Sequence, residues 1–156
     1  MGRLIQFETL RAAYEEQLRD RALMYFPWDE MEEVKKKQVF PLVRYWSRVK
    51  QNIVLEAVYR LVYDAYVWGM RSAKTARSLR MREFQDTPWE RIYARNFTDE
   101  GYDLVKSCLS QFAVEHWLDE RSLTDVYLLG EGLVIHWFCQ GVEEECKRSG
   151  KYIKRE

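Results

Sequence analysis

An uninterrupted apolar pattern that starts near Lys50 and continues past Arg80 is the feature that most constrains the fold of this chain. The pattern contains no proline, and its apolar residues recur every three or four positions, which is the period of one helix face. These residues are Val54, Val58, Leu61, Ala65, Gly69, Ala76 and Leu79. The sequence therefore predicts one long helix with a single apolar side, in a fold where other helices cover that side.

Two helical segments are expected before this long helix. The first, residues 4–26, has apolar side chains at helical spacing and should end at Pro27. Its apolar residues are Phe7, Leu10, Tyr14 and Leu18. We expect Asp29 to cap a second, highly charged segment, in which acidic residues precede lysines, an order that suits the helix dipole. Pro41 should break or restart that helix.

Another helix is expected after a turn at residues 86–90. Thr98 or Asp99 should cap it, and the acidic residues in its first turn favour a helix start there. Its apolar stripe consists of Tyr102, Val105, Leu109, Phe112, Ala113 and His116. The stripe implies that this helix buries one face as far as His116.

The last predicted helix, which should follow a cap at Ser122 or Thr124, contains the most apolar segment of the chain. Residues 126–142 are apolar on nearly every side, which predicts the central and most buried helix of the fold. Gly150 should end this helix and leave a frayed basic tail after it.

The sequence predicts a single domain. It has 156 residues with only three prolines and seven glycines, and no linker-like or repeated segment divides it. A chain of this length can bury a sufficient core without disulfides or metals. Because no strand pattern is found, we predict a single helical domain over residues 1–156, folded as an irregular all-α bundle of about five helices.

Charge and cysteine usage exclude several classes of protein. Twenty-five basic residues balance 25 acidic ones, which counts against a dedicated nucleic-acid binder and makes self-association more favourable. The three cysteines form no Cys-x-x-Cys pair, so neither a disulfide framework nor a zinc site is indicated, and Cys139 is interpreted as a small buried hydrophobe. With no signal peptide and no apolar run of about 20 residues, we expect a cytoplasmic protein with no cofactor and no membrane segment.

Two motifs resemble those of a known protein family. The first reads Asp64-Ala65-Tyr66-Val67-Trp68-Gly69-Met70-Arg71, and the second, VYLLGEGLVIHWFCQG, places Trp137 and Gly141 after Val126-Tyr127. Together with the opening LIQFETLRAAYEEQL, they resemble the YbaK-like proteins of Bacillaceae, which are unrelated to the enterobacterial tRNA-editing protein of that name. The resemblance implies a small cytoplasmic protein of a spore-forming bacterium. Because that family has no established activity, the resemblance implies no mechanism.

A basic stretch lies at the end of the long helix. Its four charges recur every three residues, at Arg71, Lys74, Arg77 and Arg80. Steps of three residues advance about 300° around a helix, so the charges sweep across roughly half of its circumference. We interpret the stretch as a solvated helix end, paired with acids at residues 29–33 or 143–145. The alternative is a phosphate or nucleic-acid contact in which Trp68 and Trp89 supply stacking.

Asp64 is the other charged residue that could be interpreted as functional, in this case as a catalytic acid. At helical spacing, Arg60 lies one turn before it and Arg71 two turns after it, with Trp68 between. This column predicts a ladder of salt bridges over an indole ring rather than a catalytic acid. Gly69 lies between the small residues Ala65 and Ala73 at helical spacing, which predicts a close helix crossing. A phosphate loop is not indicated, because it needs several glycines before a helix start.

The two histidines are the candidates for a metal or acid–base site. His116 is expected on the apolar face of its helix near Asp119 and Glu120, and His136 shares the apolar helix with Glu131. If these side chains met in a dry interior, they would suit a metal or a tuned acid–base pair. However, residues five apart lie about 140° around a helix. Glu131 and His136 therefore do not share a face, and structural histidines are favoured.

The aromatic content motivates the leading functional hypothesis. Six Trp, ten Tyr and seven Phe make up 15% of the chain, and such residues are favoured at interfaces as well as in cores. We expect a non-enzymatic helical interaction or regulatory protein with a protein partner or a second copy. The alternatives are a nucleic-acid-associated protein that uses residues 71–82, and a metal-dependent enzyme built on His116 and His136.

Overall fold

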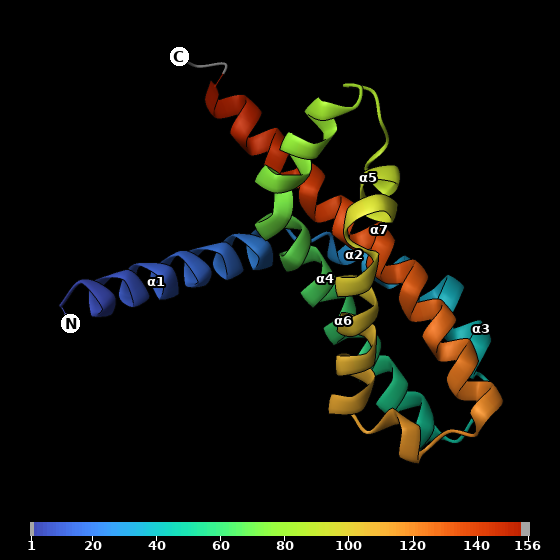
Figure 1. Ribbon diagram of the computed structural model, residues 1–156. Helices are drawn as coiled ribbons and strands as arrows, with labels where there is room; N and C mark the ends of the chain where they lie inside the picture. Colours follow the sequence, from blue (N-terminus) through green and yellow to red (C-terminus); the bar gives the residue numbers. More distant parts are fainter. Residues whose placement is uncertain (1, 154–156) are drawn as a thin grey trace.

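The regular elements of the structure are all helical (Figure 1). This computed structural model describes the backbone of residues 2–153 and the side chains of residues 8–148, and no strand occurs in this part of the chain. The helices are α1 (Gly2–Tyr25), α2 (Trp28–Val34), α3 (Phe40–Val43), α4 (Arg48–Arg82), α5 (Trp89–Asn96), α6 (Thr98–Gln111) and α7 (Glu120–Ile153). The predicted all-α class is confirmed. Because α2 and α3 form one continuous run, the described part of the chain has about six helices rather than the five predicted. The short helix α5 was not expected.

That run continues without a gap from α2 to α3. A π-helical turn at Lys35–Val39 joins them, and Pro41 stands in the first turn of α3. Because the run is continuous here, the proline removes one N–H that would donate to the preceding turn, and Pro41 directly follows the π-helical turn in which the N–H of Phe40 donates to the oxygen of Lys35. Of the two outcomes expected at Pro41, the helix restarts rather than breaks.

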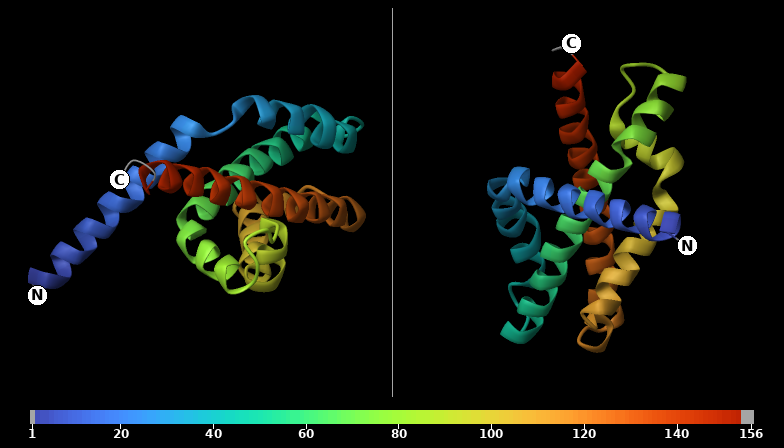
Figure 2. Two further views of the ribbon diagram at one scale, coloured as in Figure 1. Left: turned by 90° about the horizontal axis from the view of Figure 1, so that it is seen from above. Right: turned by 90° about the vertical axis from the view of Figure 1, so that its left-hand side faces the viewer.

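Helices α4 and α7 form the centre of the fold, where they run in the same general direction and cross (Figures 1 and 2). At the crossing, a Cβ atom added to Gly69 would lie 2.1 Å from the backbone oxygen of Phe138, and one added to Gly141 would lie 2.1 Å from the backbone oxygen of Tyr66. Glycine on each helix therefore lets the backbone of the other approach. Gly69 has the role that its small neighbours indicated.

Aromatic side chains fill much of the core beside this crossing. The indole of Trp137 is fully buried and stacks on the ring of Phe26, with ring centroids 5.1 Å apart, while Tyr66 meets both rings edge-on. A second cluster joins Trp68 to Phe138 at a centroid distance of 4.4 Å. A large part of the aromatic excess is therefore core, and Trp137 belongs to that core.

The helix starts differ from those expected. Asp29 lies inside the first turn of α2, which begins after Pro27, and α6 begins at Thr98, directly after Phe97. Neither helix start has a hydrogen bond from a capping side chain. At α7, Asp119 replaces both predicted caps: its carboxylate accepts a 2.7 Å hydrogen bond from the backbone N–H of Ser122. This bond holds the pKa of Asp119 below its usual value, because it favours the charged carboxylate.

The apolar stripe of α6 ends earlier than predicted. The α-helix stops at Gln111, and Ala113 takes a left-handed conformation with φ of 53°. This residue reverses the chain into a 3₁₀ turn at Val114–His116, so the helical period no longer applies to His116.

Helix α7 is central but not buried on every side. Trp137 and Phe138 face the core, whereas Leu128 is 62% exposed and Glu131 is exposed as well. Residues 126–142 therefore belong to a central helix that leaves one face exposed, whereas their nearly all-apolar sequence predicted the most buried helix of the fold. The helix also continues past Gly150 to Ile153, and residues 154–156 of the predicted tail lie outside the described part of the chain.

Helix α1 projects from the body of the molecule (Figures 1 and 2). Among its described side chains, Leu18 and Ala22 in the last turns join the core, and Phe26 follows just after the end of the helix. Leu10 and Tyr14 of the predicted apolar stripe are 71% and 50% exposed. The helix is present as predicted, but most of its described apolar stripe has no cover within the chain.

Candidate docking groove

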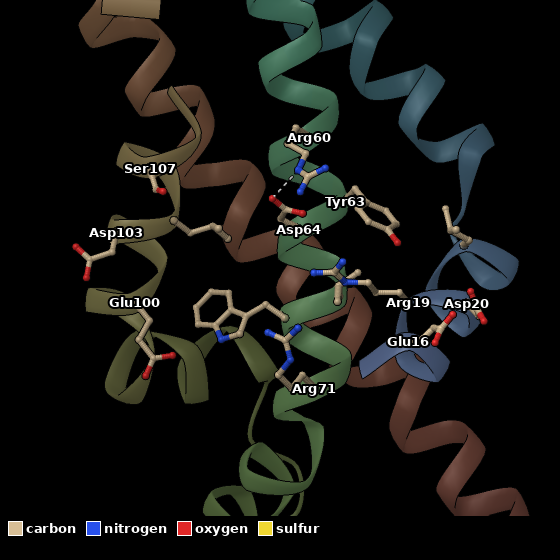
Figure 3. A pocket seen from close by; sticks show the side chains of 14 residues that line it. Glu16, Arg19, Asp20, Arg60, Tyr63, Asp64, Arg71, Glu100, Asp103 and Ser107 are labelled. Carbon is tan, nitrogen blue, oxygen red and sulfur yellow. Dashed lines mark hydrogen bonds and ion pairs between the residues drawn. The ribbon is translucent and has the colours of Figure 1, made fainter. Parts of the chain in front are cut away.

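A groove opens along α4, with α1 as one wall and α6 as the other (Figure 3). Its volume is about 750 Å³, within the range of ligand and peptide sites. Figure 3 shows Glu16, Arg19 and Asp20 on one side of α4 and Glu100 and Asp103 on the other. Because α1 leaves the body at a wide angle, the two walls do not close over α4.

Apolar side chains form a strip along the floor of the groove, beside the charged residues Arg60, Asp64 and Arg71 of α4. Tyr63, Val67 and Trp68 supply it from α4, and Leu104 extends it onto α6. Val67 is buried, while Tyr63, Trp68 and Leu104 are half-buried and can still be covered. Burial raises the pKa of Tyr63, so its hydroxyl stays protonated and can donate a hydrogen bond to a bound group.

Two ion pairs fix the charged groups closest to the floor. Arg60 donates to Asp64 over 3.1 Å within α4, and Arg71 reaches Glu15 of α1 over 2.7 Å. The expected ladder is therefore present only in its first step, because Arg71 pairs with α1 rather than extending the column. The pair between Arg71 and Glu15 ties the α1 wall to the floor of the groove.

The remaining charges give the groove a negative balance. No ion-pair partner is found among the described side chains for four acids and one arginine of the walls. They are Glu16, Arg19, Asp20, Glu100 and Asp103. All five are exposed. An apolar floor between walls with an excess of acids favours a ligand that is apolar on one side and basic at its edges.

The basic stretch of α4 does not form a free patch. Arg71 is held by Glu15, Arg77 donates to the backbone oxygen of Cys146 over 3.4 Å, and Arg80 lies over the ring of Trp89 at 4.3 Å. Lys74 is exposed. Three of the four charges thus attach α4 to α1, α7 and α5.

These contacts are not with the acids predicted for them. Glu145 pairs with Arg21, and Glu30 pairs with His136. The stretch is therefore only in part a solvated helix end, since most of it is engaged in contacts between helices.

The histidines do not converge. His116 is exposed on the 3₁₀ turn, and His136 is exposed on α7, where its Nε2 lies 2.7 Å from a carboxylate oxygen of Glu30. Glu131 lines a small hollow beside Tyr93 instead. Among the described residues, no group of three or more His, Cys, Asp or Glu side chains is placed to hold a metal ion.

The buried thiols are equally unsuited to chemistry. Cys108 donates to the backbone oxygen of Ala57 over 3.3 Å, and burial raises its pKa to about 12. Burial raises the pKa of Cys139 to about 12 as well. Both remain protonated at neutral pH and are poor nucleophiles.

Comparison with known proteins gives no match to a family model, a curated protein or a solved structure. The resemblance to the YbaK-like proteins therefore remains a prediction that rests on the motifs alone. No described helix combines the length and the apolar character that crossing a membrane requires.

Sequence reasoning singled out four groove residues, Arg60, Asp64, Trp68 and Arg71, but for other reasons, and missed the rest. The missed wall residues, such as Arg19 and Asp103, are ordinary exposed charges of helices. Only the pattern of Tyr63, Val67 and Trp68 beside the core stripe of α4 could have indicated a second apolar surface there.

Proposed function

We propose that the protein is a non-enzymatic interaction protein and that the groove along α4 docks a basic amphipathic helix of a protein partner. The observation that carries the proposal is the combination of an apolar floor with walls whose unpaired acids outnumber their unpaired bases. A docked helix would place apolar side chains at positions i, i+3, i+4 and i+7 on the floor. Lysines or arginines beside them would meet the acids of the walls.

The walls suit this occupant on both sides. On the α6 side, Glu100 and Asp103 are one turn apart, so one face of a docked helix can reach both. On the α1 side, Glu16 and Asp20 are four residues apart, which also places them on one face about one turn apart. Partial burial of Trp68 provides a large apolar contact that a partner can complete, which is typical of residues that dominate binding energy.

Nucleic-acid binding is the less favoured alternative. A phosphate backbone requires free cations, and three of the four basic residues at positions 71–80 already hold other helices. The acids of the groove would repel phosphate groups. A metal-dependent enzyme is also disfavoured, because His116 and His136 lie apart and are both exposed.

The test uses a synthetic helical peptide of about 20 residues, long enough to be partly helical in water, with Leu on one face and Lys or Arg on the other. Fluorescence anisotropy should show that the wild-type protein binds this peptide more weakly as salt rises. A peptide with the same Leu face and Glu in place of the basic residues should not bind.

The decisive comparison is between two charge-reversal variants. Glu100→Lys with Asp103→Lys changes the α6 wall and should lower affinity about tenfold or more, as expected for several exposed pairs acting together. Asp86→Lys with Asp125→Lys makes the same change in charge at exposed sites outside the groove and should leave affinity close to wild type. Equal losses in both variants, or equal binding of the acidic peptide, would refute the proposal.

A further inference from the structure

The part of α1 that leaves the body forms a helical arm, defined here as residues 8–17, whose side chains are almost all exposed. The whole helix has 24 residues and spans roughly 36 Å, and in Figures 1 and 2 it leaves the body on one side. Of residues 8–17, only Glu15 is half-buried, and the others are exposed. A helical segment of this length has little stability of its own in water.

The arm nevertheless carries an apolar stripe. Leu10 and Tyr14 are one helical turn apart on the same side, and Leu18, one turn further, is buried where the arm meets the body. The stripe thus continues from the core onto the part of α1 that leaves the body, where Leu10 and Tyr14 stay exposed although Glu15 beside them contacts Arg71. A surface of this kind marks an interaction site.

We propose that a second copy of the chain covers this stripe, with the two arms paired antiparallel about a twofold axis. In that arrangement Leu10 of each copy packs against Tyr14 of the other, and both contacts occur twice, as an isologous interface requires. The proposal concerns a different surface from the groove and does not depend on its function.

Charge favours this self-pairing. Arg11 and Glu15 are one turn apart beside the stripe, so an antiparallel pair brings Arg11 of each copy close to Glu15 of the other. Arg71 already holds Glu15 in place over 2.7 Å, and a carboxylate has a second oxygen free to accept. The formal net charge of zero also removes overall repulsion between copies.

Other occupants fit less well. The acidic groove offers no complement to the arm, whose described residues include Glu8, Glu15 and Glu16 but only one base, Arg11. The same composition lacks the lysine- or arginine-rich face with which amphipathic helices bind anionic lipid. Because two paired arms form a small interface, we expect a reversible dimer with a dissociation constant in the micromolar range.

Sedimentation velocity over roughly 1–100 µM, which brackets the expected micromolar dissociation constant, should show wild-type protein passing from monomer to dimer. Leu10→Glu should abolish the dimer, and Arg11→Glu should weaken it several-fold. Leu128→Glu is the matched control, since Leu128 is a similarly exposed leucine on α7, and it should dimerise like wild type. A wild-type chain that stays monomeric over this range, or a loss of dimer in the Leu128→Glu control equal to that in Leu10→Glu, would overturn the proposal.

Orientation is tested by mixing Leu10→Cys with Tyr14→Cys protein under mild oxidation. Antiparallel arms should give a disulfide between the two different variants, whereas each variant alone should cross-link poorly. A dimer that instead cross-links through Leu10→Cys alone would refute the antiparallel arrangement. The native Cys108 and Cys139 are buried, and the wild-type protein under the same conditions controls for Cys146.

Discussion

Replacing Gly69 by alanine is the sharpest perturbation of this fold. The added Cβ would lie 2.1 Å from the oxygen, 2.9 Å from the carbon and 3.1 Å from the Cα of Phe138. All three atoms belong to the backbone of α7, so no side chain can rotate to make room. The two central helices must therefore move apart along the crossing.

The size of the loss follows from two opposing effects. Alanine is a better helix former than glycine by about 1 kcal/mol in a helix interior. Overpacking a tight contact costs about 1–3 kcal/mol and more where only the backbone can yield. Separation of α4 from α7 also loosens the packing of Trp137 and Phe138, so we expect a net loss in the free energy of unfolding of at least about 2 kcal/mol.

The assay is urea unfolding followed by circular dichroism, with Gly132→Ala as control. Gly132 lies on the exposed face of α7, and a Cβ added to it would meet nothing within 4 Å. The control should gain roughly 0.5–1 kcal/mol from helix propensity alone. If Gly69→Ala were as stable as wild type, or gained stability like the control, the close crossing would not exist as described.

Two further predictions concern the core. Trp137→Ala should lower the free energy of unfolding by about 3–5 kcal/mol. Because Trp137 is fully buried within one chain, thermal melts at two protein concentrations should show the same loss. As a second prediction, the free energy of unfolding should fall as pH rises from 9 toward 12. Burial raises the pKa of Cys108, Cys139, Tyr66 and Tyr93 to about 12, above the ordinary values of 9.0 for Cys and 10.0 for Tyr. In that window the unfolded chain loses protons that the folded chain keeps. Urea midpoints that stay constant from pH 9 to 11 would contradict this burial.

Helix content and the main packing face were predictable because they depend on the spacing of apolar residues along the sequence. The stripe from Val54 to Ala76 in α4 is buried as expected, and small residues around Gly69 indicated the crossing. Helix ends were less predictable. The left-handed turn at Ala113 has no proline or glycine to mark it. Helix α5 has only eight residues, although Trp89, Ile92 and Tyr93 recur in it at helical spacing.

Pairing between helices could not be predicted, because it depends on tertiary geometry. Arg71 and Glu15 are 56 residues apart, and nothing in the sequence favours this acid over the many others. The groove poses the same difficulty. The walls of the groove come from α1 and α6 and its floor from α4. The groove therefore depends on the angle at which α1 leaves the body, which the sequence does not indicate.

The close crossing of the central helices also positions the floor of the groove. Trp68 precedes Gly69 in α4, and its ring packs on Phe138, the residue whose backbone Gly69 contacts, at a centroid distance of 4.4 Å. The ring of Phe138 supports Trp68 from the core, and the rings of Tyr93 and Phe97 also contact Trp68 edge-on. Gly69 allows the short distance between α4 and α7, so it also determines the position of the Trp68 indole in the proposed docking surface. Its replacement should weaken peptide binding even in the fraction of molecules that remains folded.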